Sequence, residues 1–230
     1  MISVRTVQPS QRSFPWRACV VTAAAALGVS ALAPRPALAQ GQALQPQLAG
    51  RELVEALAGG GYVILMRHAA TDRFVSDPDR FDLADCATQR NLSEAGRRQA
   101  TLTGRSFEKL GIEVSRVLTS PYCRCVDTGK LAFGRAEKSE ALAAVDDLTY
   151  PERDARGMQI RQMLGAPPAA GTNTVLITHT GNLLYSFGLQ ARPEGIAHVF
   201  RPAEIGPAPY VGTIVPDEWP ALAGIASGTP

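Results

Sequence analysis

Three short apolar segments of the sequence each end in, or lead to, an arginine or a histidine, and this repetition restricts the fold strongly. The segments and their polar residues are 61–71 with Arg67 and His68, 114–121 with Arg124, and 174–178 with His179. Short apolar runs between turn residues are typical of the buried strands of a parallel sheet. Because such sheets place ligands at the carboxyl ends of their strands, the sequence predicts that these side chains meet at one edge.

Segments with the spacing of amphipathic helices alternate with these strands. The expected helices cover residues 51–58, 93–110, 121–133, 153–164 and 181–187. We also expect a strand at residues 140–145, and two edge strands, antiparallel to each other, at 195–201 and 210–215. This order predicts an α/β fold: a three-layer sandwich with a mostly parallel central sheet and helices on both faces.

The first 39 residues have the parts of a secretory signal peptide. Arginines precede an alanine-rich apolar stretch at residues 18–33, and an Ala-x-Ala ending closes at Ala39. The apolar stretch is shorter than the roughly 20 residues that a membrane-spanning helix needs. We therefore expect cleavage after Ala39, a periplasmic or secreted protein without a stable membrane span, and one domain from residue 40 to 230.

The apparent basic character of the chain comes from this leader. Residues 1–39 contain four arginines and no acidic residue, which leaves 19 basic against 21 acidic residues after cleavage. No basic stripe with interleaved aromatic residues remains. We therefore expect no nucleic acid among the partners.

Three cysteines remain after cleavage: Cys86, Cys123 and Cys125. In an exported protein an odd number indicates one disulfide and one free thiol. Cys123 and Cys125 are too close along a predicted helix to pair with each other. Cys86 is therefore expected to pair with one of them, and the choice stays open. The Cys-x-Cys spacing does not suit zinc, because it is one residue short of the common unit and no histidine follows at ligand distance.

The side chains at the predicted strand ends suit a phosphoryl group. Arginine can grip two phosphate oxygens with its planar guanidinium group, and Arg67 and Arg124 are the candidates. Neutral His68 can attack phosphorus, and His179 can stabilise the charge that develops. No acidic cluster suits a metal, so we expect neither a metal nor another cofactor.

Four segments resemble the motifs of the histidine phosphatase superfamily (phosphoglycerate mutase-like, branch 1), in that family's order. Residues 67–71 resemble its Arg-His-Gly-x-Thr signature, 91–100 its Leu-Thr-x-x-Gly-x-x-Gln-Ala helix, 120–128 its Ser-x-x-x-Arg-x-x-x-Thr element and 178–182 its Gly-His-x-Gly element. The resemblance implies a covalent phosphohistidine on His68 that water hydrolyses without a metal. It also implies that phosphate is bound by Arg67, Thr71, Arg124 and His179.

The sequence departs from that family at three places. Ala69 and Thr178 replace two glycines of the motifs, which are small changes that remove no charged group. Many members of the family have a glutamate as proton donor after the third strand, whereas this chain offers Asp146 and Asp147. We expect one of these two to be the general acid, with Asp147 preferred, although the pair could instead cap the next helix.

These features favour an exported, metal-independent phosphomonoesterase. The chain is short for a phytase-like member with a helical cap, so we expect a small or accessible phosphate. Some exported relatives remove phosphate from the core of lipopolysaccharide, and this is one candidate substrate. Two alternatives remain: a non-catalytic phosphate- or phosphoglycan-binding protein, suggested by the missing glutamate and the replaced glycines, and a cytoplasmic phosphohistidine protein phosphatase that keeps its first 39 residues.

Overall fold

The computed structural model describes residues 44–72, 74–78 and 81–226. The predicted signal peptide therefore lies outside the described residues. The described residues all belong to one compact unit. Within the described part of the chain, no helix combines the length and the apolar character that crossing a bilayer requires.

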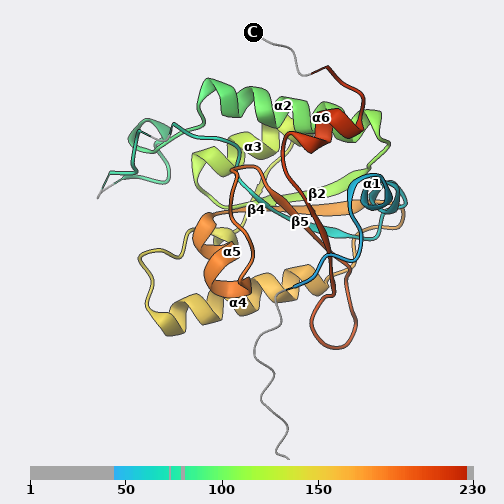
Figure 1. Cartoon of the computed structure of the whole chain (residues 1–230). Coiled ribbons are helices and arrows are strands. Elements are labelled where there is room, and N and C mark those ends of the chain that lie inside the picture. Colours follow the sequence, from blue (N-terminus) through green and yellow to red (C-terminus); the bar gives the residue numbers. More distant parts are fainter. Residues whose placement is uncertain (1–43, 73, 79–80, 227–230) are drawn as a thin grey trace, which may run out of the picture. The chain divides into compact units, whose positions relative to one another are not determined.

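Helices and strands alternate along most of the described chain (Figure 1). The strands are β1 Val63–Arg67, β2 Val114–Thr119, β3 Glu137–Lys138, β4 Asn173–Thr178, β5 Ala197–Phe200 and β6 Tyr210–Ile214. The helices are α1 Gly50–Ala58, α2 Glu94–Lys109, α3 Cys123–Phe133, α4 Tyr150–Gly165, α5 Thr180–Phe187 and α6 Glu218–Leu222. Two short 3-10 helices, η1 Cys86–Thr88 and η2 Glu140–Leu142, lie between them.

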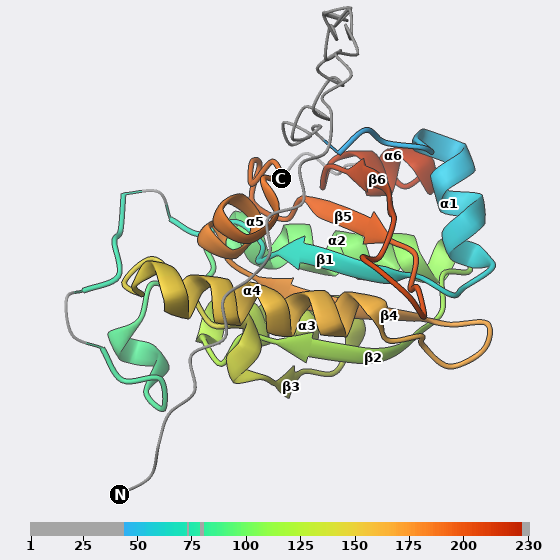
Figure 2. The same cartoon turned by 90° about the horizontal axis from the view of Figure 1, so that it is seen from below.

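The strands form one sheet in the order β3-β2-β4-β1-β5-β6. Strands β3, β2, β4 and β1 are parallel, whereas β5 runs antiparallel to both of its neighbours. Figure 2 shows β1 and β2 pointing to the same side and β5 pointing the other way. The parallel strands thus bring their carboxyl ends, and the residues that follow them, to one edge.

Alternate residues of β1 are buried in two separate cores. Ile64 and Met66 pack in a cluster with residues of α1, α2, α3 and α6, whereas Val63 and Leu65 pack in a cluster with residues of α4 and α5. Figure 1 shows α2, α3 and α6 on one face of the sheet and α4 and α5 on the other. A strand covered on both faces needs apolar residues at every position, which explains the continuous apolar run of β1. The predicted three-layer α/β sandwich is confirmed.

The strand predicted at residues 140–145 is wrong. The third strand, β3, is only two residues long and precedes this segment, which contains η2 instead. Side chains from the end of β4 and from α5 bind its backbone: Thr178 Oγ1 donates to Leu142 O (2.9 Å) and Asn182 Nδ2 donates to Ala143 O (3.1 Å). Hydrogen bonds of this kind replace those that a strand ladder would make.

The prediction of two edge strands is half right. Strands β5 and β6 pair in the antiparallel direction, but β5 lies between β1 and β6, so of these two strands β6 alone is at an edge. The residues of β5 are all buried, as an interior position requires. An interior antiparallel strand cannot be told from an edge strand by its length or its apolar content alone.

The start of α2 is packed directly on the turn that follows β1. Ser93 caps the helix by accepting a hydrogen bond from Gly96 N (3.1 Å), and its own backbone N–H donates to Ala70 O (3.1 Å). A Cβ atom at Gly96 would lie 1.8 Å from Ala70 O, so only glycine permits this approach. The glycine of the second motif thereby fixes the turn that begins at His68.

Candidate active site

A cavity of about 700 Å³ lies beyond the carboxyl ends of β1 and β4. We call its buried residues His68, Arg124 and His179 the floor; their exposed fractions are 1%, 4% and 3%. We call Asp146 and Asp147 the rim, because both line the cavity and are exposed. His68 directly follows β1, His179 directly follows β4, and Arg124 lies in the first turn of α3. These three side chains line one cavity, as the sequence predicts.

The imidazole of His68 has the form that a nucleophile needs. Its Nδ1 lies 2.9 Å from Ala69 O, and a carbonyl oxygen can only accept, so Nδ1 carries the proton. Burial, and next the charge of Arg124, hold the pKa of His68 well below its usual value. The ring is therefore neutral near pH 7, and Nε2 has a lone pair available.

His179 lies opposite His68, with 5.5 Å between the ring centroids. Its Nδ1 is 3.4 Å from Arg124 Nη2, which can only donate, so the ring proton is on Nε2 and is donated to Ser120 Oγ (2.7 Å). Burial and the nearby Arg124 also lower the pKa of His179 well below its usual value. The sequence marked Ser120 as the first residue of the third motif, and the structure makes it the hydrogen-bond partner of His179.

Arg124 is paired with a carboxylate inside the cavity. Its Nη1 donates to Asp77 Oδ1 (2.9 Å), and the guanidinium carbon lies 4.6 Å from the centre of the Tyr122 ring. Asp77 also accepts from Arg90 N (3.0 Å) and lies 3.8 Å from Arg90 Nε. Both Asp77 and Arg90 line the cavity, and sequence reasoning missed them. The only signal for Arg90 was its place directly before the second motif.

Arg67 and Thr71 are not among the residues that line this cavity. Glu194 accepts from Arg67 Nη2 (2.7 Å) and from both the backbone N and Oγ1 of Thr71 (2.9 Å each). A second Arg67 nitrogen, Nη1, donates to Ala191 O (2.8 Å). Arg67 and Thr71 line a neighbouring cavity of about 910 Å³, and Arg90 lines both. The predicted phosphate-binding residues therefore fall into two adjoining groups.

Four arginines of the described residues have a buried Nε atom without a hydrogen-bond partner. Arg153 lies on α4, whereas Arg67, Arg90 and Arg124 line the two adjoining cavities. A buried donor without a partner costs free energy, and an anion with several acceptor oxygens would satisfy such donors. The arginines that line the two cavities are therefore suited to bind an anionic ligand, whose oxygens can accept hydrogen bonds from their Nε atoms.

Residues 63–179 match the family described as "Histidine phosphatase superfamily (branch 1)". The chain belongs to this superfamily. On that membership it is a hydrolase that acts on phosphate groups. No curated protein matches the sequence significantly.

Solved structures resemble this histidine phosphatase at low identity. The putative phosphohistidine phosphatase SixA from Agrobacterium tumefaciens is 16% identical, with 67% of this chain and 98% of that chain covered and a TM-score of 0.45. A putative alpha-ribazole-5'-P phosphatase from Escherichia coli is 15% identical, with 67% and 99% covered and a TM-score of 0.45. Rv3214 from Mycobacterium tuberculosis is 17% identical, with 65% and 95% covered and a TM-score of 0.46.

The two glycine replacements are accommodated without strain in this histidine phosphatase. Ala69 is buried, and its backbone N–H donates to Thr128 Oγ1 (3.0 Å). No residue other than glycine has a positive φ in the described part of the chain. Thr178 contributes the hydroxyl that binds Leu142 O, so it fixes the segment that leads to the rim.

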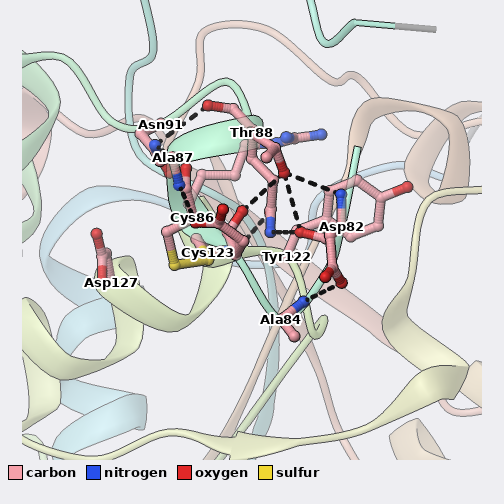
Figure 3. The surroundings of a disulfide bond; sticks show 12 residues. Asp82, Ala84, Cys86, Ala87, Thr88, Asn91, Tyr122, Cys123 and Asp127 are labelled. Carbon is pink, nitrogen blue, oxygen red and sulfur yellow. Dashed lines mark hydrogen bonds between the residues drawn. A yellow bond between two sulfur atoms is a disulfide. The ribbon is translucent and has the colours of Figure 1, made fainter. Parts of the chain in front are cut away.

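The structure resolves the choice of disulfide partner: Cys86 pairs with Cys123, with 5.7 Å between the Cα atoms. Figure 3 shows this bond joining the long segment after β1 to the start of α3, beside Tyr122. Cys125 is the free thiol, and burial raises its pKa to about 12. A thiol with such a pKa stays protonated and is a poor nucleophile, so it does not compete with His68.

Proposed function

We propose that this histidine phosphatase is an exported phosphomonoesterase that needs no metal and forms a phosphohistidine on His68. The observation that carries the proposal is the floor of the cavity. There, a neutral His68 with a free Nε2 faces a second histidine and an arginine in one buried hollow. The unpartnered Nε atoms of the neighbouring arginines add donors that suit phosphate oxygens.

The reaction has two balanced steps. In the first, His68 Nε2 attacks phosphorus, the bond from phosphorus to the leaving oxygen breaks, and that oxygen takes a proton from Asp146 or Asp147. In the second, water attacks the phosphohistidine, the phosphorus–nitrogen bond breaks, and the carboxylate takes the proton of the water. Arg124 stabilises the charge on the transferred group in both steps, and His179 holds the guanidinium in place by accepting from Arg124 Nη2 (3.4 Å).

The proposal of export rests on the sequence, whereas the proposal of a small substrate also rests on the shape of the cavity. The leader predicts a periplasmic or secreted protein, and a purified mature form that starts near Gln40 would test it. The cavity is open at its rim, which suits a small or accessible phosphomonoester. The phosphate of the lipopolysaccharide core is one candidate of this kind.

The test is hydrolysis of p-nitrophenyl phosphate in EDTA by the wild type and by His68→Ala. We expect turnover by the wild type and none by the variant. His198→Gln is the matched control, because His198 is also a buried histidine but lies on β5 with Nε2 bound to Gln190 O (2.7 Å). Equal rates for the wild type and His68→Ala would exclude His68 as the nucleophile.

Acid-quench labelling separates this proposal from the alternative of a non-catalytic binding protein. A phosphatase of this type traps phosphate covalently on His68 during turnover. A binding protein would give saturable phosphate binding and no acid-quenched label. Such a result, with the folded state intact, would favour the binding protein.

A further inference from the structure

The floor and the rim of the cavity differ in charge. Near the floor, Arg90 and Arg124 share one carboxylate, Asp77, which leaves one positive charge in excess. At the rim, Asp146 and Asp147 have no basic side chain within 4.0 Å of their carboxylates in the described part of the chain. Even the arginine that approaches the rim, Arg153, binds the backbone oxygen of Asp146 and not its carboxylate.

Aromatic rings lie between the floor and the rim. Phe81 and Tyr122 line the cavity with their ring centroids 5.2 Å apart, and both are partly buried. Burial raises the pKa of Tyr122, and the negative charges of Asp77, Asp147 and Asp146 raise it further. Tyr122, Asp146 and Asp147 line the same cavity, so one ligand there can reach both the ring and the rim carboxylates.

A phosphomonoester has only one way to occupy this cavity. Its phosphoryl group must reach His68, which is 1% exposed, and the unpartnered Nε of Arg124 marks the same buried end as an anion site. The alcohol part must then extend past the aromatic rings toward the exposed rim. A neutral or anionic alcohol would meet two carboxylates there, and a cationic one would be attracted by them.

We infer that the preferred substrates are phosphomonoesters of an amino alcohol, whose leaving group carries a positively charged amino or quaternary ammonium group. This inference rests on the proposed function. The phosphoryl group lies on the floor, and the ammonium group lies between the rim carboxylates and the rings of Phe81 and Tyr122. Aromatic faces and carboxylates are the groups that recognise such cations. Whichever aspartate gives its proton to the leaving oxygen, the other remains a carboxylate for the cation.

The test compares two substrates of the same shape. Phosphocholine has a quaternary nitrogen where 3,3-dimethylbutyl phosphate has a quaternary carbon, so the two esters differ essentially by one positive charge. We expect kcat/KM of the full chain to be about tenfold higher for phosphocholine, the size expected for a partly desolvated cation between aromatic rings. A ratio of one or below, with both esters hydrolysed, would overturn the inference and leave the proposed function intact.

Variants of the two rim aspartates test whether the preference for phosphocholine arises at the rim. Asp146→Asn or Asp147→Asn should bring the ratio toward one, and the ratio is informative even if a lost general acid slows both esters equally. Asp154→Asn is the control, because Asp154 is exposed on α4 and does not line the cavity. If an Asn variant has no turnover, calorimetric binding of the two esters gives the same comparison. A ratio above one that neither variant changes would overturn the assignment to the rim.

Failure of the proposed function gives a different pattern. In that case neither ester, nor p-nitrophenyl phosphate, would be hydrolysed, and no acid-quenched label would form on His68. The inference would then fall with the function on which it rests.

Discussion

Arg67 and Arg124 stand at the ends of different elements, and each is paired with one carboxylate at nearly the same distance. Arg67 Nη2 lies 2.7 Å from Glu194, and Arg124 Nη1 lies 2.9 Å from Asp77. The pairs differ in what else the carboxylate does. Glu194 also binds the backbone and hydroxyl of Thr71, beside the cavity that holds His68. Asp77 lines that cavity itself.

This difference indicates two roles for an acidic partner. A carboxylate outside the cavity orients its arginine and leaves the remaining donors for a ligand. A carboxylate inside the cavity occupies a donor that a phosphate oxygen could use, and thus competes with the substrate. The two pairs look alike in distance, yet removing their charges should have opposite effects.

The largest effect is expected at the floor. Arg124→Ala should lower kcat/KM for p-nitrophenyl phosphate by about 10²–10³, the usual loss when one donor to a developing charge is removed. Arg67→Ala should cost less, because Glu194 and Ala191 hold Arg67 beside the cavity. Arg116→Ala is the control, since Arg116 is an exposed arginine that pairs with Glu137. A larger loss of kcat/KM in Arg67→Ala than in Arg124→Ala would contradict the distinction between an arginine in the cavity and one beside it.

The next effect concerns the orienting carboxylate. Glu194→Gln keeps the shape of the side chain but removes the charge that holds Arg67 and Thr71, and a misplaced site can lose up to about 100-fold in rate. We expect a fall in kcat for p-nitrophenyl phosphate, measured well below the unfolding temperature of the variant, because the buried Arg67 also loses its ionised partner. Glu137→Gln removes the same charge from an exposed pair and should leave kcat unchanged. An unchanged kcat in Glu194→Gln would mean that Arg67 needs no orientation.

The competing carboxylate should act in the other direction. Asp77→Asn frees Arg124 Nη1 from an ionised partner, and a hydrogen bond to a charged group contributes about 1.5–3 kcal/mol. Because Asp77 is partly exposed, we expect the smaller consequence of roughly tenfold tighter inhibition by inorganic phosphate. Asp82→Asn is the control, since Asp82 lies in the same segment but does not line the cavity. Weaker phosphate inhibition in Asp77→Asn would show that Asp77 orients Arg124, as Glu194 orients Arg67.

The sequence predicted those parts of the site that depend on local pattern. Continuous apolar runs identified β1, β2 and β4, and parallel strands bring their carboxyl ends together whatever the details of packing. The meeting of His68, Arg124 and His179 follows from that rule alone. The helix expected at residues 93–110 likewise starts where predicted, with Ser93 as its cap, because capping is a local interaction.

The missed parts depend on contacts between distant segments. Glu194 is 127 residues from Arg67, and Asp77 is 47 residues from Arg124, so no spacing rule connects them. The segment at residues 140–145 was misassigned for the same reason, since side chains of Thr178 and Asn182 bind its backbone. The partner of Cys86 also depended on which cysteine the start of α3 turns toward it.

The smallest expected effect is on the pKa of His68, which the charges of Arg124 and Arg67 lower to different extents. Burial lowers the pKa of His68 most, the charge of Arg124 comes second, and that of Arg67 contributes less. Removing a positive charge makes protonation easier, so Arg124→Gln should raise the pKa of His68 more than Arg67→Gln does. A higher pKa leaves less neutral imidazole at a given acidic pH, so the acid limb of kcat/KM should move to higher pH in the same order. Titration of the His68 ring by NMR measures this order without any turnover. If Arg67→Gln shifts the titration more than Arg124→Gln, then Arg67 lies closer to the nucleophile in solution, and the distinction between the two pairs fails.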